Sequence, residues 1–203
     1  SRRRSGPDRA RSMARPSDPA LDALTLDELR LALAPAIASA ASFDGWSEEA
    51  VASAAAEKGV DPAAAAYAFR GGAMDMIAAW IAQVDAAMAE AFTAQALTAL
   101  PMRERIRRLV RFRLDAVAGQ RESLRRALAI MALPSNARRG LQLGWRSADA
   151  MWRLAGDTAT DYNHYSKRAI LGAIYAATLS VLVGDDSEGH CETLAFLDRR
   201  IEG

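Results

Sequence analysis

The chain has 203 residues, of which 51% are hydrophobic, and its formal net charge at pH 7 is +1. This length is enough for one domain with a sizeable core. The single cysteine, Cys191, excludes an internal disulfide and is typical of a reducing compartment. The longest apolar run, about residues 169–184, is shorter than the roughly 20 residues of a membrane-spanning helix. We therefore expect a soluble protein that can still touch a membrane surface.

The charge is unevenly distributed along the chain. Residues 1–15 hold six arginines and one aspartate, which leaves a net charge of −4 on the remaining residues. This arginine-rich start shows no hydrophobic periodicity. We therefore expect residues 1–20 to be a disordered leader rather than an arm that binds nucleic acid.

Three short helices are predicted after this leader. Thr25 and Glu28 form a capping box for the first helix, which Pro35 should kink or restart. Ser47 caps the second helix, and Pro62 begins the third after a glycine turn. Two short helices joined by such a turn outline a helix-turn-helix. The third helix has four consecutive alanines, no lysine and one terminal arginine, so we expect a degenerate motif that does not bind DNA.

The expected fold class is all-α. Valine, isoleucine, threonine and aromatic residues never alternate over a strand-length run, whereas apolar residues recur at helical spacing. We assign residues 21–72 to the degenerate helix-turn-helix subdomain and residues 73–203 to a larger bundle of about six helices. These helices are expected at about residues 73–92, 102–120, 121–131, 136–156, 157–181 and 187–201.

The helix expected at residues 136–156 carries two apolar stripes, as its residues turn by about 100° each. We interpret the stripe that contains two tryptophans as the core face: Leu141, Trp145, Ala148, Trp152 and Ala155. The second stripe is either buried as well or forms a patch for a partner, and we favour the partner patch: Leu143, Ser147, Met151 and Leu154.

The next helix has an apolar face and a face of aromatic and charged residues. Thr158 or Thr160 can cap its N-terminus, where the helix dipole also favours Asp161. Spacing predicts a core face of Ile170, Ala173, Ile174, Ala177 and Val181. The opposite face is typical of a protein-recognition helix, with a solvated back face as the alternative: Asp161, His164, Tyr165, Arg168, Gly172 and Tyr175.

Large and flexible apolar residues of the bundle predict an apolar pocket, because methionine suits a cavity that accepts flexible chains. The alternative is a filled core built from the same residues. The expected pocket residues are Trp80, Met88, Met131, Trp145, Trp152, Ile174 and Leu182.

Other chemistry has little support in the sequence. Residues 103–113 carry a net charge of +5, which indicates a solvated arginine face, with an acidic partner or anionic lipid headgroups as the alternative. His164 and His190 are the only histidines, and neither a metal-binding pair nor a phosphate-binding glycine loop is present. We therefore expect no enzyme activity, no metal and no cofactor.

Several segments resemble the ubiquinone-biosynthesis accessory proteins, a lipid-binding family with a tetracycline-repressor-like fold. The resemblance covers roughly residues 21–201, and the part with residues 161–168 is the most specific. Its segments are Phe43-Asp-Gly-Trp-Ser47, Gly71-Gly-Ala-Met-Asp-Met-Ile77, Leu133-Pro-Ser-Asn136, Asp157 to Tyr175 and Phe196-Leu-Asp-Arg-Arg-Ile201.

The resemblance implies a non-catalytic protein that binds isoprenoid or quinone lipid and presents it to a di-iron demethoxyubiquinone hydroxylase. It also implies a homodimer at a membrane surface, either the bacterial inner membrane or the matrix face of a mitochondrion. His164 departs from the pattern, since eukaryotic members are expected to have tryptophan there. The residues that fall on the family's hydroxylase-docking patch are Met151, Leu154, Asp161, His164, Tyr165 and Arg168.

Two other functions fit the same elements. One is a repressor-like transcriptional regulator with an apolar ligand pocket in the larger bundle. The other is a lipid carrier without a protein partner.

Overall fold

The computed structural model describes residue 21 and residues 23–203, and these form helices without any β-strand. The all-α prediction is therefore confirmed for this part of the chain. The predicted leader, residues 1–20, lies outside the described residues.

The three N-terminal helices are α2 (Leu26–Asp44), α3 (Glu48–Lys58) and α4 (Pro62–Ala68). Their predicted caps are present: Thr25 and Glu28 form the capping box, and the Ser47 side chain accepts a hydrogen bond from the backbone of α3. Gly59 adopts a left-handed conformation with φ of 67° and ends α3. Glycine adopts this conformation without steric cost, so the chain can turn sharply into α4.

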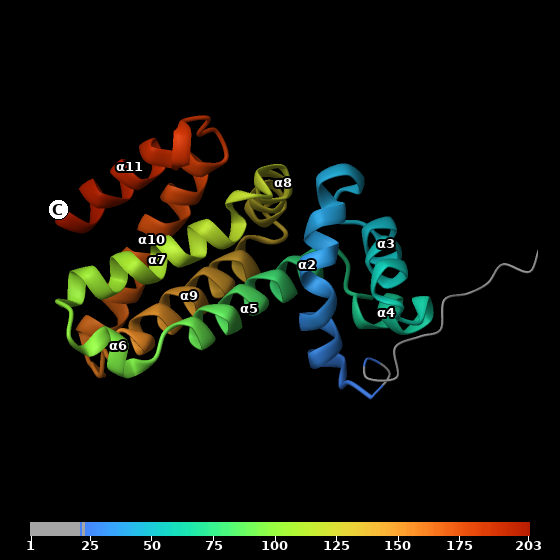
Figure 1. Ribbon diagram of the computed structural model, residues 1–203, viewed down its shortest axis with the longest axis horizontal. Helices are drawn as coiled ribbons and strands as arrows, with labels where there is room; N and C mark the ends of the chain where they lie inside the picture. Colours follow the sequence, from blue (N-terminus) through green and yellow to red (C-terminus); the bar gives the residue numbers. More distant parts are fainter. Residues whose placement is uncertain (1–20, 22) are drawn as a thin grey trace, which may run out of the picture.

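The larger bundle consists of six longer helices and one short helix, with α11 on the far side of the bundle from α3 and α4 (Figure 1). The short helix α6 was not predicted. A 3₁₀ turn, Glu188–His190, precedes α11. The helices are α5 (Ala73–Ala91), α6 (Ala94–Thr98), α7 (Met102–Ala118), α8 (Arg121–Ala132), α9 (Ala137–Leu154), α10 (Tyr162–Leu182) and α11 (Cys191–Glu202).

The N-terminal helices pack directly on the bundle, because α2 contacts both α5 and α8. Trp46, which follows α2, is buried at this junction, and its ring centroid lies 5.4 Å from that of Trp80 on α5. The Trp46 indole N–H also donates a hydrogen bond of 3.0 Å to the carbonyl oxygen of Ser123 on α8. A satisfied indole group within an apolar contact holds the two parts together.

Two local predictions need correction. Pro35 does not interrupt α2, which continues from Leu26 to Asp44. Pro35 is on the exposed side, and the fully buried side chains of Leu33 and Ile37 hold the helix in place on both sides of it. The cap of α10 is Asp161 rather than Thr158 or Thr160, since the Asp161 carboxylate accepts a hydrogen bond from the Asn163 backbone.

The predicted core face of α10 is wrong, and that of α9 is only partly confirmed. Leu141 is 76% exposed and Ile170 is 60% exposed, and Ala173 and Ala177 are also exposed. On α9, Ala148 and Ala155 of the predicted stripe are buried, and most of the second apolar stripe is buried as well. On α10 the buried face includes Arg168 and Tyr175, which hydropathy assigns to solvent. The buried residues of the two helices are Leu143, Ser147, Ala148, Met151, Arg168, Leu171, Tyr175, Thr178, Leu179 and Leu182.

Candidate functional site: an apolar cavity beside a polar surface hollow

A cavity of about 430 Å³ opens into the bundle between α9 and α10. Side chains of α5, α7 and α8 form its inner wall, including Ile77, Trp80 and Leu124. Leu141 and Ala173, both exposed, contribute to the wall from α9 and α10 and place the opening at the surface. A largely apolar cavity of this size suits a lipid or a hydrophobic small molecule.

Three of the seven predicted pocket residues line this cavity: Trp80, Met131 and Trp145. The other four lie elsewhere. Met88 and Leu182 are fully buried in the core, and Ile174 packs against it. The Trp152 indole N–H donates a hydrogen bond to the carbonyl oxygen of Lys167, whose ammonium group lies over the tryptophan ring.

Glycines create part of this space and were missed in the sequence. Gly140 and Gly144 on α9 and Gly172 on α10 line the cavity, and a Cβ atom placed on Gly172 would lie 3.9 Å from the Gly144 carbonyl oxygen. A Cβ atom placed on Gly144 would meet no other atom within 4 Å, so the space beside it is open. The sequence contained a signal for this space: glycine inside two predicted helices. Glycine destabilises a helix interior, so its presence there indicates a role in packing or function.

One group of polar side chains interrupts the apolar wall. Arg113 on α7 is 1% exposed, and its Nη1 forms an ion pair with Asp85 on α5. Its Nη2 donates a hydrogen bond of 3.0 Å to the Ser147 hydroxyl on α9, and its guanidinium carbon lies 5.1 Å from the ring centroid of Tyr175 on α10. Burial lowers the pKa of Arg113, but Tyr175 and Asp85 outweigh burial and raise it, so the side chain stays charged.

A second, polar hollow lies on the surface beside the cavity. It is lined by residues that include Asp157, His164 and Tyr165, and Arg168 lines both the hollow and the apolar cavity. Tyr165 is 61% exposed. Its ring centroid lies 5.1 Å from that of His164 and 6.0 Å from that of Trp145, which lines the cavity. The two sites therefore share one wall.

Arg168 is a structural residue at this wall. It is 2% exposed, and its Nε donates a hydrogen bond of 2.7 Å to Asp149 on α9. Its Nη1 donates to Asp157 and to the carbonyl oxygen of His164. Burial raises the pKa values of Asp149 and Asp157, but hydrogen bonds to cationic side chains outweigh burial and lower both values. Asp149 accepts these bonds from Arg168 and Arg153, and Asp157 accepts them from Lys167 and Arg168. This network fastens the start of α10 to α9.

The expected exposure of the partner patch is thus only partly confirmed. Asp161 and Tyr165 are exposed, and His164 and Leu154 are half-buried. Met151 is fully buried and Arg168 is nearly so, which contradicts the expectation that they lie on the surface. Met151 faces the core because the second stripe of α9 packs inward, and Arg168 is buried because two carboxylates balance its charge.

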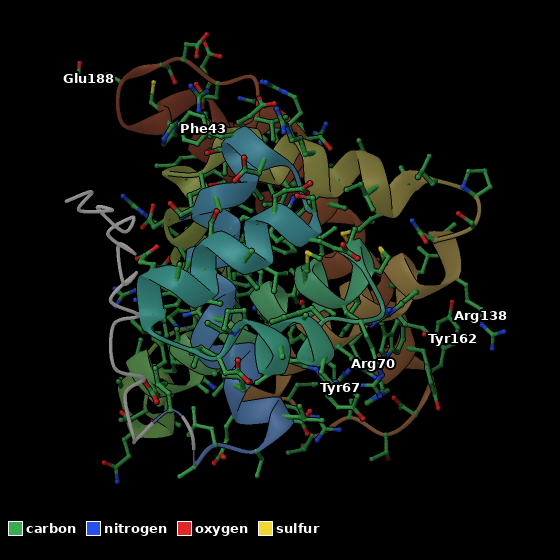
Figure 2. All side chains as sticks on the ribbon, turned by 90° about the vertical axis from the view of Figure 1, so that its right-hand side faces the viewer. Phe43, Tyr67, Arg70, Arg138, Tyr162 and Glu188 are labelled. Atoms are coloured by element: carbon green, nitrogen blue, oxygen red, sulfur yellow. The ribbon has the colours of Figure 1, made fainter. Side chains whose placement is uncertain are left out.

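The outer surface of α4 has little positive charge. Figure 2 shows Tyr67 and Arg70 next to each other on this surface. The Arg70 guanidinium lies 4.2 Å from the Tyr67 ring centroid and donates a hydrogen bond to the Tyr67 carbonyl oxygen. The position that carries the recognition helix in a helix-turn-helix is therefore occupied mainly by alanine and a tyrosine.

Most arginines of residues 103–113 have partners within the protein. Arg105 donates hydrogen bonds to the carbonyl oxygens of residues 98, 100 and 155. Arg107 pairs with Glu104 and Asp198, and Arg108 pairs with Glu104. These contacts account for much of the basic segment without an acidic ligand.

The described part of the chain has no membrane-spanning helix and no metal-binding cluster. None of its helices has the length and apolarity needed to cross a membrane. None of its histidine, cysteine, aspartate and glutamate side chains form a group of three suited to a metal ion.

The fold defines the class of protein first. The structure is similar to the crystal structure of a TetR transcriptional regulator from Nitrosomonas europaea, with a TM-score of 0.67. The match covers 86% of this chain and 97% of that chain at 24% identity, so it shows a tetracycline-repressor-like fold and nothing finer.

The sequence is similar to one family of proteins. The family model COQ9 matches residues 137–203, which contain α9, α10 and α11. The chain is related to the COQ9 proteins of ubiquinone biosynthesis, as the resemblance in its sequence predicted.

The curated relatives extend this match over most of the chain. The mitochondrial ubiquinone biosynthesis protein COQ9 of Rattus norvegicus is 35% identical over 164 residues, which are 77% of this chain and 52% of that protein. The human protein is 34% identical, with 77% and 51% covered. The probable coq9 protein of Dictyostelium discoideum is 25% identical, with 78% and 53% covered. The chain thus spans about half the length of these relatives.

Proposed function

We propose that this protein is a non-catalytic lipid-binding accessory protein of ubiquinone biosynthesis. Its cavity binds an isoprenoid or quinone lipid, and its surface presents that lipid to a di-iron demethoxyubiquinone hydroxylase. The observation that carries this proposal is the shared wall: Arg168 lines the apolar cavity and the polar surface hollow, and Tyr165 contacts the cavity residue Trp145.

The lipid part of the proposal rests on the chemistry of the cavity. Its wall is built mainly from aliphatic, tryptophan and small side chains, including Ile81, Val84 and Leu128. Burial of apolar area contributes about 25 cal/mol per Å² to binding, so an isoprenoid chain gains affinity in such a space. The relatives are named as ubiquinone biosynthesis proteins, and intermediates of that pathway carry isoprenoid chains, which supports an isoprenoid ligand.

The partner part rests on side chains that line the hollow or directly follow a residue that lines it. We place the hydroxylase contact at Leu154, Asp161, His164 and Tyr165, which combine an apolar centre with a charged edge. Met151 and Arg168 support this surface from inside. Tyrosine is a common anchor of interfaces, since it buries a large area with few rotatable bonds.

The exposed apolar face of α9 and α10 suits two further contacts. Leu141 and Ala173 line the cavity mouth, and we place the mouth against a peripheral membrane surface, from which a lipid could enter. Ile170 and Ala177 extend the exposed face along α10, and we assign this part to a homodimer contact. The membrane is the bacterial inner membrane, or the matrix face of the inner membrane if the protein is mitochondrial.

The hydroxylase contact is tested by measuring capture of a purified di-iron demethoxyubiquinone hydroxylase. Tyr165→Ala should weaken binding about 30-fold, because truncation of a hot spot costs about 2 kcal/mol. Tyr67→Ala is the matched control, since Tyr67 is also an exposed tyrosine but lies on α4. Full affinity of a folded Tyr165→Ala protein would show that the contact lies elsewhere.

A repressor-like transcriptional regulator is the second candidate, and the fold similarity to a TetR regulator favours it. The surface of α4 argues against it, because Arg70 is the only arginine or lysine in residues 59–72. A gel-shift assay with the gene's own upstream DNA separates the two functions. Specific, salt-sensitive binding would support the regulator, since phosphate contacts make DNA affinity salt-dependent.

A further inference from the structure

The buried arginine in the cavity wall is the feature that lipid binding alone does not explain. An isoprenoid chain needs only apolar contacts, yet Arg113 and Ser147 line the cavity and are at least 98% buried. Tyr175 lines the cavity beside them and is 9% exposed. Burying a charged side chain costs free energy, so a buried arginine next to a cavity indicates a functional role.

One donor nitrogen of Arg113 has no hydrogen-bond partner in the part of the chain that the structure describes. Its Nη1 pairs with Asp85 and its Nη2 donates to Ser147. Its Nε is buried and has no hydrogen-bond partner among the described residues. An unpaired buried N–H is unfavourable, and an acceptor atom of a bound ligand would satisfy it.

The charge balance of this group restricts the ligand. The guanidinium of Arg113 is already paired with the carboxylate of Asp85, so the pair is neutral. A second carboxylate or phosphate in the cavity would bring a buried negative charge without its own counter-ion. A neutral oxygen, such as a carbonyl, ether or hydroxyl oxygen, accepts a hydrogen bond at no such cost.

We propose that Arg113, with Ser147 and Tyr175 beside it, is a head-group site that binds a neutral oxygen-bearing ring of the lipid. Arg113 Nε donates to a ring oxygen, and the Tyr175 ring packs next to the guanidinium. This inference rests on the proposed lipid function and adds selectivity to it: the cavity distinguishes a quinone-type head group from a plain hydrocarbon or a fatty acid.

The test compares three probes with the same decyl tail: decylubiquinone with a neutral quinone ring, the hydrocarbon decylbenzene, and the carboxylate 4-decylbenzoate. Binding is followed by the fluorescence of the protein's tryptophans, of which Trp80 and Trp145 line the cavity. The double variant Arg113→Met with Asp85→Leu removes both charges together. Arg113→Lys keeps the ion pair but lacks Nε, and it serves if the double variant fails to fold. Arg111→Met, at an exposed position of the same helix, is the matched control.

Each variant is compared with the wild type for the same probe, so differences in probe solubility cancel. We expect decylubiquinone to bind about tenfold more weakly to both Arg113 variants, whereas decylbenzene affinity stays within twofold and Arg111→Met binds all probes normally. Wild-type protein should also bind decylbenzoate more weakly than decylubiquinone. Equal losses for decylubiquinone and decylbenzene, or no loss for either, would overturn the head-group site while leaving the lipid cavity intact. If the wild type binds none of the probes, both proposals are wrong.

Discussion

Filling the cavity from Gly144 should stabilise the protein and prevent lipid binding at the same time. Gly144 is inside α9, lines the cavity, and has no atom within 4 Å of the position of an added Cβ. Gly144→Leu should therefore place its side chain in the cavity without displacing a neighbour.

The gain in stability follows from two contributions. Replacing glycine inside a helix contributes about 1 kcal/mol. Full burial of a leucine side chain contributes about 1.5–3 kcal/mol, but the cavity is open to the surface and buries the side chain only in part. We expect the free energy of unfolding to rise by about 2 kcal/mol, which corresponds to an increase in melting temperature of about 4–8 °C for a domain of this size.

The assay combines thermal unfolding with titration of decylubiquinone. Gly144→Leu should melt at a higher temperature than the wild type and bind the quinone at least tenfold more weakly. Gln142→Leu is the matched control, because Gln142 is exposed on the same helix and does not line the cavity. If Gly144→Leu binds the quinone with wild-type affinity, the cavity between α9 and α10 is not the lipid site.

Two predictions concern the ion network of α9 and α10. Arg168→Ala should lower the free energy of unfolding by about 2–3 kcal/mol in denaturant titrations. It removes the buried hydrogen bonds to both carboxylates, although Asp157 keeps Lys167 and Asp149 keeps Arg153. Arg153→Ala, on an exposed partner of Asp149, should cost less than about 1 kcal/mol. Retained stability of Arg168→Ala would show that the network does not hold the two helices. The second prediction concerns pH. The pKa values of Asp149 and Asp157 are lower in the folded protein than in the unfolded chain, so the two ionised carboxylates stabilise the fold. This stabilisation is complete above the usual carboxylate pKa and is lost as the pH falls through the lower folded values. Unfolding measured between pH 7 and pH 2 should show a smaller acid loss in Arg168→Ala than in the wild type, and an equal loss would contradict this assignment.

Local signals predicted the helices well. The caps at Thr25 and Ser47 and the glycine turn at Gly59 depend only on neighbouring residues, and all three are present. The bounds of α5, α7, α8 and α9 agree with the prediction to within two residues, because long periodic segments determine them. In contrast, α10 begins at Tyr162 instead of residue 157, and α11 begins at Cys191 instead of residue 187.

The faces of α9 and α10 could not be predicted in this way. A helix such as α9 has two apolar stripes, and only its packing against α5, α7, α8 and α10 decides which one is buried. On α10, Arg168 is buried because Asp149 and Asp157, which are distant in sequence, neutralise it. Hydropathy treats an arginine as solvated and has no information on such partners.

The cavity was predicted as a feature, but most of its residues were not. Bulky side chains such as Trp80 and Trp145 indicated it correctly. The space itself comes from small residues, including Gly144 and Gly172, whose effect depends on how two helices cross. Arg113 gave no distinguishing signal, since it stands in a run of arginines and only the fold turns it inward.

Identification of the lipid that accompanies the protein tests the central proposal most directly. The protein is purified from cells that make ubiquinone and extracted with organic solvent, and the extract is analysed by mass spectrometry beside that of Gly144→Leu. We predict an isoprenoid quinone or its precursor in the wild-type extract, enriched over its share in the host membranes, and little of it in the variant extract. An extract without isoprenoid lipid, or equal amounts from both proteins, would contradict the proposal that this cavity carries the lipid.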